Sequence, residues 1–177
     1  MSRALEALYE GNVERANELL PADTDLTVFE AAAFGRLNRL EEILAADPSQ
    51  ANALSADGFS ALHLAIFGDR EEAARVLIAN GADVDRWSEG SIARVPPLGT
   101  AAFVRSARLA RLLLDAGADV NARGEGGFTA LHTAAQNGDV ELARELLARD
   151  ADRNAVAHDG VRPCDLASTD ELRRLLR

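Results

Sequence analysis

Residues 124–154, GEGGFTALHTAAQNGDVELARELLARDADRN, contain one complete structural unit from which the rest of the chain can be interpreted. A glycine-rich turn comes first, and the hydroxyl of Thr129 can then cap a short helix. Gly138 can end that helix, because glycine tolerates a left-handed conformation. In the segment that follows, apolar residues recur at helical spacing and charged residues fill the positions between them. The stretch therefore predicts a turn followed by two short helices.

The same unit recurs along the chain at a nearly constant interval. Equivalents of Leu131 lie at Leu62, Leu98 and Cys164, so successive copies are 36, 33 and 33 residues apart. A second landmark, an Ala-Asp pair near the end of each unit, repeats at the same intervals, at residues 82–83, 118–119 and 151–152. Two landmarks in register predict a stack of repeated units.

The repeated motif resembles a known family. Residues 60–65, SALHLA, and residues 129–134, TALHTA, resemble the Thr-Pro-Leu-His-x-Ala signature of ankyrin repeats. Residues 117–121, GADVN, resemble the start of the ankyrin hairpin, and the chain is similar to small ankyrin-repeat proteins of the bacterial type. The resemblance implies an all-α solenoid of stacked helix-turn-helix units joined by β-hairpin loops, with degenerate capping units at both ends. It also implies a concave face of the kind that family members use to bind proteins.

We expect one ankyrin-repeat domain over residues 1–177, divided into an N-terminal cap unit (1–25), a degenerate repeat (26–54), three repeats (55–86, 87–123 and 124–156) and a C-terminal cap unit (157–177). The repeat at 87–123 departs most from the pattern, because its hairpin is extended by three residues. Gly99 stands there at the signature histidine position and Arg105 at the glycine turn. Asp150 replaces the glycine that ends the earlier units, so we expect local strain at this residue.

Composition and charge narrow the function classes. The chain has 19 basic and 29 acidic residues, and this net charge of -10 repels phosphate backbones and anionic lipid surfaces. We therefore expect no nucleic-acid partner and no membrane partner. The single cysteine, Cys164, allows no internal disulfide, and residues 1–20 carry four glutamates where a signal peptide needs an apolar run. These features predict a soluble, cytoplasmic and monomeric protein.

The residues that could carry chemistry are better explained by structure. His63 and His132 occupy the repeat's own slot, where an imidazole can satisfy nearby backbone and hydroxyl groups. His158 stands alone in a hairpin, and Cys164 takes a leucine slot in the core. We therefore expect no catalytic residue, no metal and no cofactor. The alternative from another class is a small hydrolase that uses His132, His158 and nearby carboxylates, but positions one repeat apart cannot readily meet.

The remaining candidate is the predicted concave face. Hairpin tips and the exposed side of each first helix place seven residues on or near it: Trp87, Phe67, Phe103, Phe59, Phe128, Gln136 and Asn137. Trp87, the only tryptophan, lies in the irregular hairpin where no core slot requires it, so it is the first candidate for a binding hot spot. It could instead cover the longer loop. Phe59 and Phe128 follow a turn glycine and could serve either the fold or a partner.

These observations lead to a hypothesis about function. We expect a non-enzymatic protein–protein interaction module that binds an unidentified partner protein through the concave face, with Trp87 and the region of Phe67 and Phe103 at its centre. Three basic residues close in sequence to this region, Arg94, Arg105 and Arg123, could pair with acidic groups of the partner or be ordinary solvated charges. The alternative is a dedicated inhibitor or immunity-type partner of one enzyme or toxin, which the acidic charge would suit if the target were basic.

Overall fold

The computed structural model describes residues 2–90 and 94–177 of the chain. Met1 and residues 91–93, the centre of the predicted extended hairpin, lie outside the described part. The chain divides into two compact units. Unit 1 comprises Met1–Asp83 with Ser88–Ile92, and unit 2 comprises Val84–Trp87 with Ala93–Arg177.

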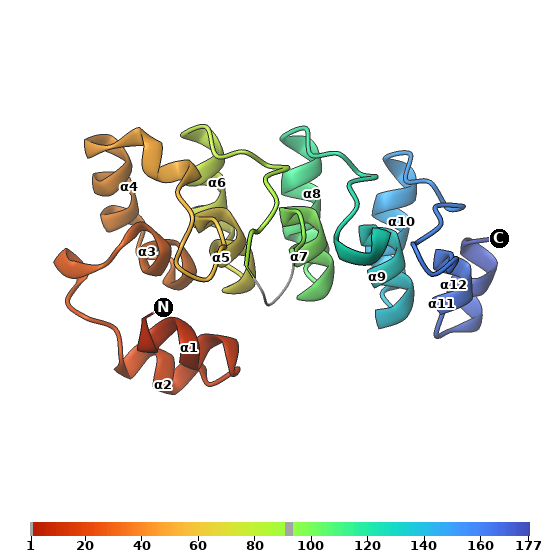
Figure 1. Ribbon diagram of the computed structural model, residues 1–177, viewed down its shortest axis with the longest axis horizontal. Helices are drawn as coiled ribbons and strands as arrows, with labels where there is room; N and C mark the ends of the chain where they lie inside the picture. Colours follow the sequence, from red (N-terminus) through yellow and green to blue (C-terminus); the bar gives the residue numbers. More distant parts are fainter. Residues whose placement is uncertain (1, 91–93) are drawn as a thin grey trace. The chain divides into compact units, whose positions relative to one another are not determined.

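Unit 1 consists of short helices arranged in pairs. Its α-helices are α1 (Arg3–Tyr9), α2 (Val13–Glu18), α3 (Val28–Phe34), α4 (Leu37–Ala46), α5 (Ala61–Phe67) and α6 (Glu71–Ala79), with 3-10 turns η1 (Asp23–Asp25) and η2 (Pro48–Asn52). Two helix-turn-helix pairs, α3 with α4 and α5 with α6, lie side by side, so that α3 packs on α5 and α4 packs on α6 (Figure 1). The face between α3 and α5 is rich in fully buried alanines, including Ala31, Ala32 and Ala65. Small side chains let the two backbones approach closely.

Unit 2 repeats this arrangement. Its helices are α7 (Pro97–Phe103), α8 (Ala107–Asp115), η3 (Glu125–Gly127), α9 (Ala130–Asn137), α10 (Val140–Ala148), α11 (Pro163–Leu166) and α12 (Asp170–Leu175). The first helices pack in the order α7, α9, α11, and the second helices in the order α8, α10, α12 (Figure 1). The predicted all-α fold of helix-turn-helix units is therefore confirmed. No helix within the described residues is both long and apolar enough to cross a bilayer.

The connecting loops are less regular than the predicted β-hairpins. Within residues 2–90 and 94–177 there is no β-strand, and the loops carry two isolated antiparallel bridges, Leu54 with Ser60 and Arg123 with Thr129. Each bridge ends at the residue that caps the next helix. The loop therefore delivers the cap residue to a defined position.

The first helices begin at capping pairs of the kind that the sequence predicts. Before α3, the backbone N–H of Thr27 donates to Oε2 of Glu30 (3.0 Å), and the N–H of Glu30 donates to the Thr27 hydroxyl oxygen (3.4 Å). Such reciprocal pairs satisfy amide groups that have no partner inside the helix. In α7 the pair is absent, and Pro97 occupies the first helical turn instead. Because proline has no backbone N–H, this helix start has one donor fewer to satisfy.

Left-handed backbone marks the turns inside and between the repeats. Gly138 ends α9 with φ of 74°, and the equivalent Arg105 adopts φ of 60° although it carries a side chain. At the end of the second helix, Gly117 has φ of 93° and its equivalent Asp150 has φ of 63°. Asp150 therefore carries the expected backbone strain, because the left-handed region of φ and ψ favours glycine.

We predict that Asp150→Gly raises the free energy of unfolding by about 0.5–1 kcal/mol. A left-handed residue with a side chain costs about 1–2 kcal/mol, and the greater freedom of glycine in the unfolded chain offsets about half of this gain. Urea unfolding followed by circular dichroism measures the change. Gly117→Ala is the matched control and should cost about 1 kcal/mol, since no atom lies within 4 Å of the added methyl group. An unchanged or lowered unfolding midpoint for Asp150→Gly would contradict the assignment of strain.

Candidate functional site

His132 is buried and hydrogen-bonded at both ring nitrogens. The backbone N–H of Thr129 donates to Nδ1 (3.2 Å), so Nδ1 is an acceptor and the ring proton lies on Nε2. Nε2 lies 3.2 Å from the carbonyl oxygen of Val161 in the next loop and donates to it. The side chain is 0% exposed, and burial lowers its pKa below the ordinary value. His132 therefore stays neutral and connects its own helix cap to the following repeat.

The other two histidines do not complete an acid–base site. In unit 1, Nδ1 of the buried His63 lies 2.8 Å from the hydroxyl oxygen of Ser60, in the arrangement expected from the sequence. His158 is exposed in the loop before α11, and its backbone N–H donates to the carbonyl oxygen of Gly126 (2.8 Å). Among residues 2–90 and 94–177 there is no group of three or more His, Cys, Asp or Glu that could hold a metal ion.

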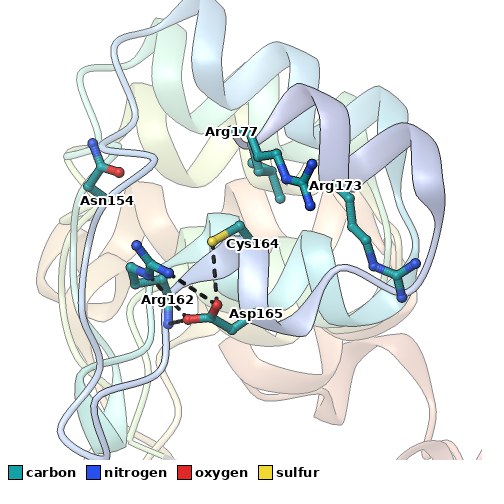
Figure 2. A pocket seen from close by; sticks show the side chains of 7 residues that line it. Asn154, Arg162, Cys164, Asp165, Arg173 and Arg177 are labelled. Atoms are coloured by element: carbon teal, nitrogen blue, oxygen red, sulfur yellow. Dashed lines mark hydrogen bonds and ion pairs between the residues drawn. The ribbon is translucent and has the colours of Figure 1, made fainter.

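A pocket of about 330 Å³ lies near the last helices, and three of its polar residues contact one another (Figure 2). The Arg162 side chain donates to both oxygens of Asp165 (3.2 and 3.3 Å), and the thiol of Cys164 also faces this carboxylate (3.6 Å). The hydrogen bonds from Arg162 lower the pKa of Asp165. Neither His132 nor His158 lines the pocket. The pocket therefore contains an internally compensated ion pair with a cysteine thiol beside its carboxylate.

The predicted binding residues of unit 1 contact the chain itself. The ring centroid of Phe67 lies 5.1 Å from that of Tyr9 in α1, in an edge-to-face geometry. Phe59 lies 6.0 Å from the same Tyr9 ring and 5.8 Å from the ring of His63. Both phenylalanines are partly buried against the N-terminal helices. In this structure they pack inside unit 1.

Two of the predicted residues in unit 2 also support the fold. The half-buried Phe128 ring lies 5.0 Å from the ring of His132, which matches the contact between Phe59 and His63 in unit 1. The side-chain amide of Asn137 donates to the carbonyl oxygen of Ala102 (3.2 Å) and so ties α9 to α7. Contacts of this kind hold neighbouring repeats in register.

The structure brings Trp87 and Arg94 together on the two sides of residues 91–93. Cζ of Arg94 lies 5.7 Å from the centre of the Trp87 ring, within the range of a cation–π contact. The indole remains 39% exposed. By contrast, Arg123 is bonded to the backbone of two loops. Its guanidinium donates to the carbonyl oxygens of Val156 (2.7 Å) and Gly127 (3.3 Å).

Phe103 and Gln136 stand at equivalent positions of α7 and α9, which pack against each other. Phe103 is 67% exposed, the largest exposure of any large apolar side chain in the described part of the chain. Gln136 is also exposed. These two helices therefore present an exposed aromatic ring and an exposed amide at equivalent positions.

Sequence reasoning did not single out the residues that engage Phe59 and Phe67. The hydroxyl of Tyr9 donates to Oδ2 of Asp57 across 48 positions of sequence (2.7 Å). One signal was available, since Asp57 stands where the regular repeat has Gly126. The ring contacts of Tyr9 could not be predicted from the repeat pattern, because α1 lies outside the regular repeats.

Comparisons with known proteins agree with the geometry. A family model for ankyrin repeats in many copies matches residues 106–167, and a model for the single ankyrin repeat matches residues 57–88. The two matches together cover parts of both units.

Several curated proteins are similar to this chain. Protein phosphatase 1 regulatory subunit 27 of Homo sapiens is 37% identical over 108 residues, which cover 58% of this chain and 65% of that protein. A putative ankyrin repeat-containing protein of Treponema pallidum is 42% identical over 92 residues, 52% of this chain and 30% of that protein. Alpha-latrocrustotoxin-Lt1a of Latrodectus tredecimguttatus is 34% identical over 104 residues, 58% of this chain and 7% of that protein. The chain thus spans less than two thirds of the length of each of these relatives.

We predict that acidification from pH 7.5 to 5.5 lowers the free energy of unfolding, in part through His132. Burial depresses the native pKa of His132, so the unfolded chain binds a proton near the ordinary value of 6.5 while the native state resists it. Stability contributed by the neutral ring is therefore lost as the pH falls below that value. Urea unfolding across this pH range measures the slope.

His132→Gln should make this dependence on pH shallower, because glutamine does not titrate. His158→Gln is the matched control, since it removes an exposed histidine from the same unit and should leave the slope unchanged. An unaltered slope for His132→Gln would contradict the proposed role of its burial.

Proposed function

Because the chain belongs to the ankyrin-repeat family, we propose that it is a non-enzymatic binding protein that recognises another protein through the concave positions of its first helices. Ankyrin-repeat chains are protein–protein interaction modules. Packed helix pairs present a preformed surface, so little conformational entropy is lost when a partner binds. The engagement of both ring nitrogens of His132 supports a non-enzymatic role.

The observation that carries the proposal is the exposure of Phe103. This ring is 67% exposed on a packed helix, next to the exposed amide of Gln136 at the equivalent position of the following repeat. Aromatic side chains on rigid elements are favoured anchors of protein interfaces, because they bury a large area with few rotatable bonds. We therefore place the centre of the binding surface on α7 and α9.

Trp87 and Arg94 form a second candidate contact of unit 2. The cation–π geometry limits the orientations of the indole and leaves the ring 39% exposed. A guanidinium beside an aromatic ring can receive a carboxylate of a partner while the ring covers apolar surface. This pair is proposed as a flanking contact to Phe103.

The charge of the chain favours a protein partner over nucleic acid or lipid. A net charge of -10 repels both phosphate backbones and anionic membranes. We propose a monomer in the cytoplasm, in keeping with the single cysteine and its lack of an internal disulfide partner.

A second candidate function is regulation of a single enzyme or toxin as a dedicated inhibitor or immunity-type partner. The similarity to a protein named as a regulatory subunit of protein phosphatase 1 favours this candidate. The acidic charge would also speed association with a basic target. A single partner that is recovered in equimolar amount and loses activity when bound would distinguish this function from a general scaffold.

We predict that Phe103→Ser weakens partner binding at least tenfold without lowering the urea unfolding midpoint. The ring is mostly exposed, so its loss removes little packing, whereas an aromatic hot spot contributes about 2 kcal/mol or more to binding. Immobilised protein is used to capture partners from a lysate of the organism that encodes the chain, and captured proteins are quantified by mass spectrometry.

Val156→Ser is the matched control, because Val156 is an exposed apolar residue of a loop in the same unit. We expect at least one protein of the lysate to be captured by wild type and by Val156→Ser but not by Phe103→Ser. Equal recovery of every protein by the Phe103→Ser variant would remove α7 from the proposed surface. Trp87→Ala tests the flanking contact in the same assay, and equal recovery there would remove Trp87.

A further inference from the structure

Equivalent positions of the repeat are covered in unit 1 and open in unit 2. Phe67 in α5 and Phe103 in α7 are the same residue type, 36 positions apart, at the same place in the repeat. Phe103 is 67% exposed, whereas Phe67 is packed edge-to-face against Tyr9 of α1. Leu64, one helical turn before Phe67, is 1% exposed. The face that unit 2 leaves open is therefore occupied in unit 1 by the chain's own N-terminal helices.

The occupying segment is a pair of amphipathic helices. α1 and α2 lie on the side of α3 and α5 that faces away from α4 and α6 (Figure 1). The buried contact consists of small and leucine side chains of α1 and α2 against residues of α3 and α5: Ala4, Leu5, Ala7, Leu8, Ala16, Ala33, Phe34 and Leu64. Docking of an apolar helix face into a preformed apolar surface is a recurring mode of peptide recognition.

Hydrogen bonds secure the C-terminal end of α1. At its end, the Tyr9 hydroxyl donates to Oδ2 of Asp57 (2.7 Å), and Oδ1 of the same carboxylate accepts from Ser55 (2.6 Å). Burial and the neighbouring Asp57 raise the pKa of Tyr9, so its hydroxyl keeps the proton that it donates. The site thus holds a hydroxyl donor at the C-terminal end of α1.

The surface of unit 1 differs from the regular repeat at the positions that meet α1. Three of these positions and their counterparts are Asp57 for Gly126, Leu64 for Thr133 and Phe67 for Gln136. Glu30 stands where the regular repeat has His132, and each pairs with the threonine three residues before it. These replacements supply an apolar floor and the Asp57 carboxylate, which are groups that α1 contacts.

The N-terminal helices are short and are joined to the repeats by an exposed segment. α1 and α2 span 7 and 6 residues, too short to be stable helices without a packing surface. Residues 21–25, which join them to the repeats, are exposed. The capping pair of Thr27 and Glu30 lies wholly within the start of α3 and does not require α1. The cap of α3 therefore contains no group from α1 or α2.

We propose that α3, α5 and residues 55–59 form a helix-binding surface, which α1 and α2 occupy in the free protein and an amphipathic helix of a partner occupies after displacing them. The partner helix carries small and leucine side chains on one face and a hydroxyl donor near its C-terminal end. This inference goes beyond the binding proposed at Phe103, and its test needs no identified partner, so either proposal can fail without the other.

The test uses the whole chain and a peptide of its own residues 2–20. The double substitution Leu5→Asp and Leu8→Asp places two charges in the buried contact and should detach α1 from α3 and α5. We call this protein the opened variant. A fluorescently labelled peptide should then bind this variant at least tenfold more tightly than wild type, as measured by anisotropy. In wild type the peptide competes with a tethered copy whose effective concentration is about millimolar.

A second variant identifies the surface. Leu64→Thr with Phe67→Gln, made in the opened variant, installs the residues that the regular repeat carries at 133 and 136 and should abolish peptide binding. Hydrogen exchange should show that the opened variant loses protection in α1 while α3 and α5 retain theirs.

Three results would overturn the proposal. Equal peptide binding by wild type and the opened variant would mean that α1 does not occupy the site. Absence of binding by an opened variant whose α3 and α5 remain protected would mean that the surface does not bind helices. Loss of protection in α3 and α5 together with α1 would make the N-terminal helices a structural cap that cannot be displaced.

Discussion

The hydrogen-bonded pair at the start of each regular first helix organises the rest of the structure. A threonine or serine caps the helix, and the side chain three residues later bonds back to it, as in Thr27 with Glu30, Ser60 with His63 and Thr129 with His132. This pair sets the residue at which the helix begins. Because side chains of a helix project at a regular angular interval, the starting residue also decides which positions are buried between helices and which face outward.

The outward positions are where the two units differ in chemistry. In unit 1 they carry Leu64 and Phe67, which pack beneath α1. In unit 2 they carry Phe103 and Gln136, which are exposed. One scaffold thus presents a covered apolar face in one unit and an open aromatic face in the other. The alanine-rich contacts between neighbouring helices need not change for this difference to arise, since they lie on other sides of the same helices.

The fold could be predicted from the sequence because its determinants are local and repeat in register. Period, capping residues and turn glycines each recur, and even the irregular Asp150 adopts the left-handed backbone that its position requires. The candidate site was only partly predictable. Arg123 and Asn137 are bonded to backbone of neighbouring repeats, and Tyr9 meets Asp57 across 48 positions, so no local pattern encodes these contacts. The replacement of the signature histidine by Glu30 was visible in the sequence, and the structure shows that it caps α3 together with Thr27.

The central claim is that one repeat position is open in unit 2 and covered in unit 1. Hydroxyl-radical footprinting of the whole chain tests it most directly, because Phe67 and Phe103 have the same intrinsic reactivity and differ only in their surroundings. The structure predicts that Phe103 is oxidised several times faster than Phe67, in keeping with its 67% exposure. Equal oxidation of the two rings in the free protein would contradict the account.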